Sequence, residues 1–263
     1  MSNLRVMSFN LKYDFKSNDN NEWKKRCERI IKVFKENNPD IIGTQEGLIH
    51  MLKDMEEGLS EYAWVGNDRS GEGIDEFNAV FFKKDKFELL EWKQFWLSKT
   101  PEVPGSKDFN SSLPRICTEV ILRCKENNKN IVFYNTHLDH ESELAREEGI
   151  KIIINKIKES YFSNGYPYMI VGDFNCYLHN ELFNIVEELE EENVKFNNCY
   201  TNIDHSIKGT FHDFKGGYDG DIIDYLLYSE EFKLQELYID DDLICGGYPS
   251  DHYPVIGDFI INQ

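Results

Sequence analysis

Hydrophobic positions in the first part of the chain follow two different periods. Residues 4–9 (LRVMSF) alternate as a strand does, and residues 40–45 (DIIGTQ) form a second short apolar run. Between them, residues 22–37 place apolar side chains three or four positions apart, which is the period of an amphipathic helix. The order strand, helix, strand predicts the opening unit of an α/β layer.

The middle of the chain, from about residue 62 to 137, changes to short strands with turns between them. Segments rich in β-branched and aromatic residues lie at 63–67, 78–83, 87–97, 116–124 and 130–137. The Pro-containing stretch 100–114 predicts a surface loop. This part of the chain is therefore expected to be antiparallel.

Helical spacing returns after residue 140. Residues 142–160 predict a long amphipathic helix with Leu144, Ile150, Ile153, Ile154 and Ile157 on one face. A buried strand at 168–172, a second helix near 180–190 and strands at 224–229, 234–239 and 253–260 complete the pattern. With 263 residues and no low-complexity linker, we expect one domain over residues 1–263.

Composition limits the possible partners. Hydrophobic residues make up 40% of the chain, which is enough for a packed core, and the formal net charge is −19. Proteins that neutralise many duplex phosphates need a basic surface, so we expect no stable binding of duplex DNA. A short or small phosphorylated substrate, reached through a metal ion, is compatible with this charge.

Cysteine usage and hydropathy bear on the compartment. The six cysteines form no CxxC pair, and no apolar run reaches the roughly 18 residues that span a bilayer. No secretory leader pattern precedes the first strand. We expect a reduced, cytoplasmic protein without a membrane span, and a monomer.

Polar side chains stand at the ends of the predicted strands. If these strand ends share one edge of the fold, the side chains converge there, as active sites do in layered α/β proteins. The residues concerned are Asn10, Glu46, His137, Asp173, Asn175, Asp224, Asp251 and His252.

Two of these motifs offer carboxylates after apolar strands. In GDFN (172–175), strand alternation would put Asp173 and Asn175 on one side, although an Asx turn that ends the strand is the alternative. In TQEG (44–47), Glu46 suits a hard cation such as Mg²⁺, although a solvated glutamate is the commoner case.

Histidines accompany carboxylates in two further motifs. Asp224 lies inside an apolar strand and needs a partner, and His252 of the SDH motif is a natural one, unless that motif only makes a turn before Pro254. In NTHLDH (135–140), His137 and Asp139 share one face of a strand end, where the histidine could be an acid, a base or a structural group.

Two loop motifs could contact a substrate. Arg115 begins a strand after the long loop and could bind phosphate oxygens or form a surface ion pair. Phe211 and His212, in the turn-rich segment GTFHDF, could stack on a base or pack against the fold.

The order of these motifs resembles the endonuclease/exonuclease/phosphatase superfamily from Arg5 to Phe259. SDHYPV is similar to the pancreatic DNase group, whereas TQE, NTHL, GDFN, GTF and IDY are similar to bacterial relatives of the poly(A) deadenylases. The resemblance implies a four-layer α/β sandwich, in which two packed, mostly antiparallel sheets are flanked by helices (DNase I-like). It also implies phosphoester hydrolysis with Mg²⁺ or Mn²⁺.

The resemblance also implies roles for the motif residues. Glu46 would be the main metal ligand, with Asn10 and Asp251 close to the metal or its waters. Asp173 would orient or deprotonate the attacking water, and Asn175 would hold the water and the phosphate.

The remaining roles concern the phosphate. Asp224 would hold His252 as a phosphate ligand, and Arg115 and His137 would bind or protonate phosphate oxygens. Phe211, His212 and Asp139 are candidates for substrate binding. In some DNases a Glu pairs with the equivalent of His137, and Glu76 is the candidate in this chain.

Three functions stay open from the sequence. The first is a phosphodiesterase or nuclease for single-stranded or short nucleic acid, similar to a 3′-to-5′ exonuclease. The second is a phosphoesterase for phosphosugars, inositol phosphates or phospholipid head groups, and the third is a non-catalytic binding protein. Loops 66–76, 98–114 and 204–221 are expected to select the substrate, and two of them carry the acidic stretches 71–76 and 216–221.

Overall fold

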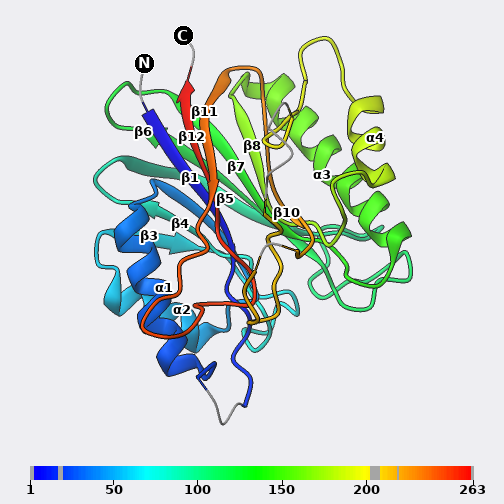
Figure 1. Cartoon of the computed structure of the whole chain (residues 1–263). Coiled ribbons are helices and arrows are strands. Elements are labelled where there is room, and N and C mark those ends of the chain that lie inside the picture. The colour runs from blue at the N-terminus through cyan, green and yellow to red at the C-terminus, as the bar shows by residue number, and fades with distance from the viewer. Residues whose placement is uncertain (1–2, 17–19, 202–207, 218, 262–263) are drawn as a thin grey trace.

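Two six-stranded sheets form the middle layers of the structure, a computed structural model that describes residues 3–16, 20–201, 208–217 and 219–261 (Figure 1). The first sheet has the order β11 (Phe232–Ile239), β12 (Val255–Ile261), β1 (Asn3–Asn10), β2 (Ile41–Gln45), β4 (Val80–Lys83), β3 (Tyr62–Val65). The second has the order β5 (Phe87–Trp96), β6 (Ile116–Cys124), β7 (Asn130–His137), β8 (Tyr168–Asp173), β10 (Asp224–Tyr228), β9 (Asn197–Asn198).

Parallel pairing is confined to one strand pair in each described sheet. β1 pairs with β2 and β7 pairs with β8 in parallel, whereas the other neighbours are antiparallel. The expected pair of packed, mostly antiparallel sheets is confirmed. The loop segments 204–207 and residue 218 of the predicted substrate loop lie outside the described residues.

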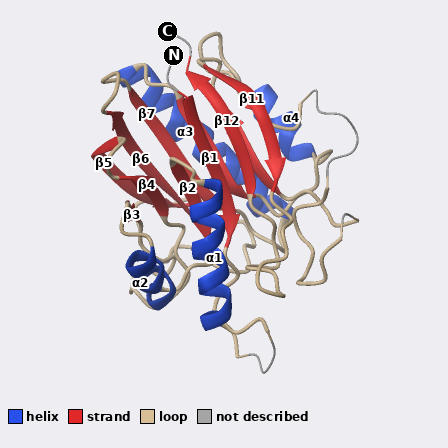
Figure 2. Ribbon diagram, turned by 60° about the vertical axis from the view of Figure 1, so that its left-hand side comes forward, coloured by secondary structure: helices blue, strands red, loops and turns tan. Residues whose placement is uncertain are grey.

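Helices cover the outer face of each sheet. Figure 2 shows α1 (Trp23–Asn37) and α2 (Ile49–Gly58) in front of the sheet that contains β1 and β2, with α3 (Glu143–Asn164) and α4 (Glu181–Glu188) behind. The four-layer sandwich expected from the sequence is therefore present. None of the described helices is both long and apolar enough to cross a lipid bilayer.

Three local predictions need correction. The sequence interpretation missed α2 and the two-residue strand β9. It also placed Leu144 on the buried face of α3, where the side chain is exposed. Leu144 precedes Ile153 by nine positions and so lies about 180° from it around a helix of 3.6 residues per turn, whereas the buried Ala145 lies about 80° from Ile153.

Strand alternation divides the core between the layers. In β1, Met7 and Phe9 belong to the cluster that packs under α1 and α2, and Val6 belongs to the cluster between the sheets. The inner cluster continues to Ile153 of α3. All six cysteines are free thiols, and Cys245 is the exposed one.

A polar contact joins the two sheets where β2 lies against β7 and β8. A Cβ at Gly43 of β2 would lie 2.3 Å from Cγ2 of Val171 in β8, so no larger residue fits without a shift. Beside it, Asn135 of β7 donates to the carbonyl oxygens of Thr44 (2.8 Å) and Ala79 (2.9 Å) and accepts from Gln45 Nε2 (2.7 Å). This buried amide ties β7 to the end of β2.

Candidate active site

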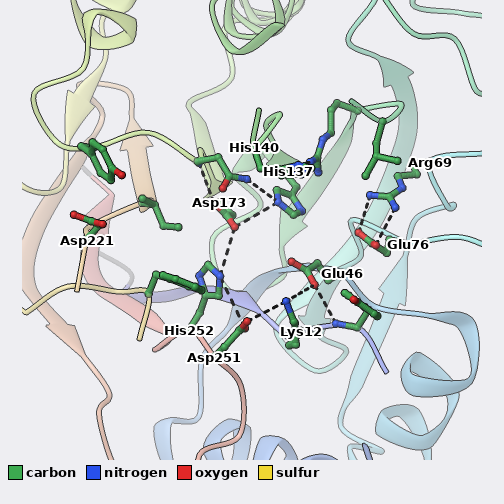
Figure 3. A pocket seen from close by; sticks show the side chains of 17 residues that line it. Lys12, Glu46, Arg69, Glu76, His137, His140, Asp173, Asp221, Asp251 and His252 are labelled. Carbon is green, nitrogen blue, oxygen red and sulfur yellow. Dashed lines mark hydrogen bonds and ion pairs between the residues drawn. The ribbon is translucent and has the colours of Figure 1, made fainter. Parts of the chain in front are cut away.

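The predicted strand ends meet at one edge of the sandwich. β1, β2, β7 and β8 end there, and β6, β10 and β12 begin there, because each of the last three is antiparallel to a neighbour in the first group. A cavity of about 660 Å³ opens at this edge (Figure 3). Eight of the predicted residues line it: Glu46, Arg115, His137, Asp173, Asn175, Phe211, Asp251 and His252.

Asp173 is the buried carboxylate at the centre of the cavity. Its Oδ2 accepts from Asn10 Nδ2 at 3.0 Å, and its Oδ1 accepts from the backbone N–H of Asn175 at 2.9 Å. Burial and the charge of Asp224 raise the pKa of Asp173, against the opposing effects of His252 and Asn10. A carboxylate with a raised pKa is a stronger base.

Asn175 reaches the cavity through a turn and not through strand alternation. β8 ends at Asp173, and Asn175 has φ 49°, in the left-handed region. The hydrogen bond from its N–H to Asp173 Oδ1 forms an Asx turn. The Asx turn, given above as the alternative to a site residue placed by strand alternation, is therefore itself part of the site. Asn175 Nδ2 lies 2.9 Å from His137 Nε2 and 3.1 Å from the Leu138 carbonyl oxygen.

The predicted contact between His252 and Asp224 is present. His252 Nδ1 lies 2.9 Å from Asp224 Oδ2, and both side chains are buried. Burial lowers the pKa of His252, but the charge and hydrogen bond of Asp224, with Asp173 and Asp251, raise it to about 10. The ring is therefore an imidazolium at neutral pH, and its Nε2 lies 3.7 Å from Asp173 Oδ2.

His137 has the opposite charge preference. Burial, together with the positive charges of Arg115 and His252, holds the pKa of His137 well below its ordinary value. Its Nε2 lies 3.4 Å from Asp173 Oδ2 and 2.9 Å from Asn175 Nδ2. A neutral ring in this position favours hydrogen bonding over the protonation of phosphate oxygens.

Glu46 and Asp251 face each other across a lysine that the sequence interpretation did not select. Lys12 Nζ lies 3.1 Å from Asp251 Oδ2 and 4.0 Å from Glu46 Oε2 (Figure 3). Asn10 also belongs to this group, because its Nδ2 donates to Glu46 Oε1 at 3.0 Å and its Oδ1 accepts from the Lys12 N–H at 2.9 Å.

The backbone around these carboxylates is unusual. Glu46 and Lys12 have φ values of 59° and 53°, which non-glycine residues adopt at a cost of order 1 kcal/mol or more. Arg26 of α1, fully buried, donates to the carbonyl oxygens of Leu11 (2.5 Å) and Tyr13 (3.0 Å) and so fixes the chain on both sides of Lys12.

Arg115 lines the cavity with its guanidinium supported from behind by Asp139. Arg115 Nε lies 3.4 Å from Asp139 Oδ2, and its Nη2 lies 2.8 Å from His140 Nδ1. The Asp139 carboxylate also accepts from the hydroxyl of Ser112 at 2.7 Å and from the N–H of Ser142 at 2.8 Å. Burial opposes ionisation, yet these hydrogen bonds and Arg115 hold the pKa of Asp139 far below its ordinary value.

Two predicted substrate contacts do not line the cavity. The carboxylate of Asp139 is used by Arg115, by the loop 98–114 and by the start of α3. His212 is buried and stacks on Tyr253, with ring centroids 3.9 Å apart. Phe211 does reach the cavity, where its ring contacts His252 edge-on at 5.1 Å.

Glu76 does not pair with His137. Both of its oxygens accept from Arg69, Nη1 at 2.8 Å and Nη2 at 2.9 Å (Figure 3). The expectation from the DNases fails because this nearby guanidinium, which the sequence interpretation did not select, engages the whole carboxylate. Burial and the charge of Glu46 raise the pKa of Glu76 to about 7, against the effect of Arg69.

Some further cavity residues come from the three loops expected to select the substrate. They are Arg69, Glu76, Leu113 and Asp221, which join Phe211 there. Lys12, Tyr13 and Tyr177 lie outside those loops, and the spacing of Lys12, two residues after Asn10, is the one sequence feature that could have identified it.

Donor groups for a metal ion occur in two places. Asp173, Asp224 and His252 offer ligand atoms within 4.8 Å of one another. Glu46 and Asp251 lie on either side of the Lys12 ammonium, which shows that a positive charge fits between these carboxylates, and Asn10 adjoins Glu46. The donor set of the second group, oxygen atoms without thiols, matches Mg²⁺ or Mn²⁺ better than zinc.

The site combines carboxylates at the strand ends of the sandwich with two histidines, His137 and His252, beside Asp173. These are the features of a phosphoesterase site. The model of the Endonuclease/Exonuclease/phosphatase family matches residues 7–252, and the chain belongs to this family. The expected superfamily is thus confirmed.

Three known proteins show what the chain is similar to. The mannosyl-6-phosphatase of Bacteroides thetaiotaomicron is 31% identical with a TM-score of 0.90, covering 98% of this chain and 100% of that one. The catalytic domain of human Nocturnin, solved with bound sulfate, is 18% identical with a TM-score of 0.78, covering 99% and 95%, and shares the fold. An uncharacterized protein of Acanthamoeba polyphaga mimivirus is 28% identical over 168 residues, and the match spans 59% of each protein.

Proposed function

We propose that this chain is a Mg²⁺- or Mn²⁺-dependent phosphoesterase that acts on a small phosphorylated ligand, specifically the phosphate monoester of a sugar. The observation that carries the proposal is the distribution of charge in the cavity. The cations Arg115 and His252 line the same cavity as Asp173. On one side of this centre the Glu76 carboxylate is paired with Arg69, and on the opposite side Asp221 adds a negative charge (Figure 3). One phosphate is accommodated at the cations, and a second along a polynucleotide would meet a neutral ion pair or a negative charge.

Asp173 is the base in this proposal. Water attacks the phosphorus atom and its proton passes to Asp173 Oδ2, while the bond to the leaving oxygen breaks; that oxygen keeps the bonding electrons and takes up a proton from solvent. Asn10 and the N–H of Asn175 hold the carboxylate in place through hydrogen bonds of 3.0 and 2.9 Å. The neutral His137 ring lies 3.4 Å from the same oxygen, the Asn175 side-chain amide lies 2.9 Å from that ring, and the two orient the water.

His252 and Arg115 stabilise the charge that develops on the phosphate oxygens. Asp224 holds His252 Nδ1 at 2.9 Å, which keeps the ring charged and directs Nε2 into the cavity. Asp139 likewise holds Arg115 from behind, with its Oδ2 3.4 Å from Arg115 Nε. Each cation thus has a buried carboxylate behind it and its free donors toward the substrate.

Glu46, Asp251 and Asn10 would hold the divalent cation, displacing Lys12. Once bound, the cation would polarise the phosphate and neutralise charge on its oxygens. We favour this group over Asp173, Asp224 and His252, because His252 Nδ1 is already bonded to Asp224 and the charged ring has no free lone pair.

The relatives support the small substrate. A protein that is 31% identical over 98% of this chain carries the name mannosyl-6-phosphatase, whereas Nocturnin, at 18%, supports the fold alone. A nuclease acting on single strands is the second candidate, because Tyr13, Tyr177 and Phe211 line the cavity and could stack on bases.

A substrate panel distinguishes these functions. The metal-free protein is assayed with Mg²⁺, Mn²⁺ or EDTA on p-nitrophenyl phosphate and its bis ester, hexose phosphates, inositol phosphates, sphingomyelin, poly(A) and single-stranded DNA. We expect metal-dependent hydrolysis of the monoester and of a hexose phosphate. Preferred cleavage of poly(A) would establish the nuclease instead, and inertness on every substrate would favour a binding protein.

A further inference from the structure

The ion pair between Arg69 and Glu76 lies in the cavity but has no part in the chemistry described above. Arg69 is buried, and the Glu76 side chain is 15% exposed. A buried ion pair seldom adds net stability, because removing both charges from water costs about as much as their attraction returns. A buried pair that still borders a cavity is therefore better explained by a ligand.

The loop that carries the pair is held in one conformation. The Asp68 carboxylate accepts from the Ser70 hydroxyl and from the N–H groups of Gly73 (2.8 Å) and Asp75 (3.0 Å). The Trp96 indole N–H donates to the Arg69 carbonyl oxygen at 2.6 Å. Arg69 and Glu76 are thus preorganised, which lowers the entropy lost when a ligand binds.

The hydrogen-bonding capacity of the pair is only partly used. A guanidinium has five N–H donors, and Arg69 gives one to Asp75 (2.9 Å) and two to Glu76. Among the contacts that the structure describes, one N–H on each of Arg69 Nη1 and Nη2 and a lone pair on each Glu76 oxygen are not used. A phosphate would be repelled by Glu76 and a cation by Arg69, whereas a hydroxyl group both donates and accepts and satisfies the two together.

The pair adjoins the end of the cavity that binds phosphate. Arg69, Glu76, Arg115 and His137 line one narrow gap in the packing. The charges of Glu46 and Arg115 both act on the Glu76 carboxyl group. A ligand whose phosphate contacts Arg115 would therefore bring its neighbouring atoms to the pair.

We infer that Arg69 and Glu76 form the subsite that binds the hydroxyl groups of the sugar next to the phosphate. This inference rests on the proposed phosphoesterase function. It adds the group that selects sugar phosphates over phosphomonoesters without hydroxyl groups. Glu76 accepts hydrogen bonds from the hydroxyl groups, and Arg69 orients Glu76 and donates to the same oxygens.

The test compares two substrates in one variant. Glu76→Gln keeps the shape of the side chain and removes its charge. We expect its KM to rise about tenfold on the best-cleaved hexose phosphate, as for the loss of hydrogen bonds to a charged group. On p-nitrophenyl phosphate, which has no hydroxyl groups, kcat/KM should change less than about threefold.

Controls separate a subsite from a fold defect. Glu72→Gln removes the same charge from an exposed position of the same loop and should leave both substrates unaffected. Arg69→Lys retains the charge without the fork and should repeat the selective rise in KM. Circular dichroism and thermal unfolding verify that each variant is folded.

The outcomes are distinguishable. An equal loss on both substrates, or no loss on either, would overturn the hydroxyl subsite while leaving the phosphoesterase intact. Hydrolysis of p-nitrophenyl phosphate without cleavage of any hexose phosphate by the unmodified chain would also overturn it. Failure to hydrolyse p-nitrophenyl phosphate at all would instead count against the proposed function.

Discussion

The cavity has two walls of different origin. One, the strand wall, is built at strand ends: Asp173 and Asp224 are held by regular backbone pairing, and His252, just before β12, is held by its contact with Asp224. The other, the loop wall, has two parts on opposite sides of the strand wall, Arg69 with Glu76 on one side and Asp221 on the other, and these residues depend on turns and local hydrogen bonds. The strand wall carries groups suited to the reaction, and the loop wall carries groups suited to distinguishing ligands.

The difference teaches how such a fold can keep one reaction and change its substrate. Positions on strands are fixed by pairing with both neighbours, so catalytic geometry survives changes elsewhere. Loops tolerate substitution because few other elements depend on them. We therefore expect variants of the strand wall to affect all substrates equally and variants of the loop wall to affect them selectively.

The largest effect should come from the strand wall. Asp173→Asn removes the base and should lower kcat by at least about a hundredfold, the usual worth of a positioned acid or base. Single-turnover rates on p-nitrophenyl phosphate and on the best natural-type substrate should fall by similar factors. Near-normal rates in a folded Asp173→Asn protein would remove Asp173 from its role.

The next effect concerns the carboxylate behind Arg115. Asp139→Asn leaves the guanidinium without a charged partner and presents an amide to two donors, so we expect a loss of about 2 kcal/mol in unfolding free energy. Because folding lowers the pKa of Asp139, its contribution is present above the ordinary Asp pKa of about 3.9 and is lost as the pH falls through the lower, folded value. Urea unfolding at pH 7 and pH 3 measures the loss of unfolding free energy in Asp139→Asn and its change with pH. If the difference in unfolding free energy between the unmodified chain and the variant were larger at pH 3 than at pH 7, the role assigned to Asp139 would be wrong.

Lys12 lies between two carboxylates of the proposed metal site, and its removal should affect metal binding. Its ammonium occupies the space between Glu46 and Asp251, so Lys12→Met should tighten Mn²⁺ binding about tenfold. Isothermal titration of the metal-free protein at fixed ionic strength gives the Kd. The control is Lys32→Met on α1, which makes the same charge change at a lysine that pairs with Glu36. Weaker Mn²⁺ binding in Lys12→Met would contradict the prediction and show that the lysine supports the metal site.

The smallest effect should come from the exposed edge of the loop wall. Asp221 is exposed, and charges in solvent are screened, so Asp221→Asn should change KM for a hexose phosphate by about threefold and leave kcat unchanged. Steady-state kinetics on a hexose phosphate and on p-nitrophenyl phosphate provide the comparison. A hundredfold loss on both would place Asp221 among the catalytic groups and break the division between the walls.

Sequence patterns predicted the strand wall and missed most of the loop wall, for a physical reason. For a polar residue at the end of an apolar strand, such as Asp173 or Asp224, the alternation of the strand predicts on which face of the sheet the side chain lies. Arg69 acquires its position from the turns that Asp68 organises, and no periodicity describes those. Glu76 was therefore paired with the wrong partner, and Asn175 was placed by alternation when a left-handed turn directs it.

The amide of Asn135 gives the molecule a further property. Asn10 belongs to the first sheet and His252 leads into its strand β12, whereas Asp173 and Asp224 belong to the second sheet, so the contacts that complete the site cross between sheets. Asn135 bonds β7 to Thr44 just before Glu46, and it sets the alignment of one half of the site against the other. The Asn135 amide is thus one of the polar groups that keep the two sheets in register, and its loss should shift the two halves of the site against each other.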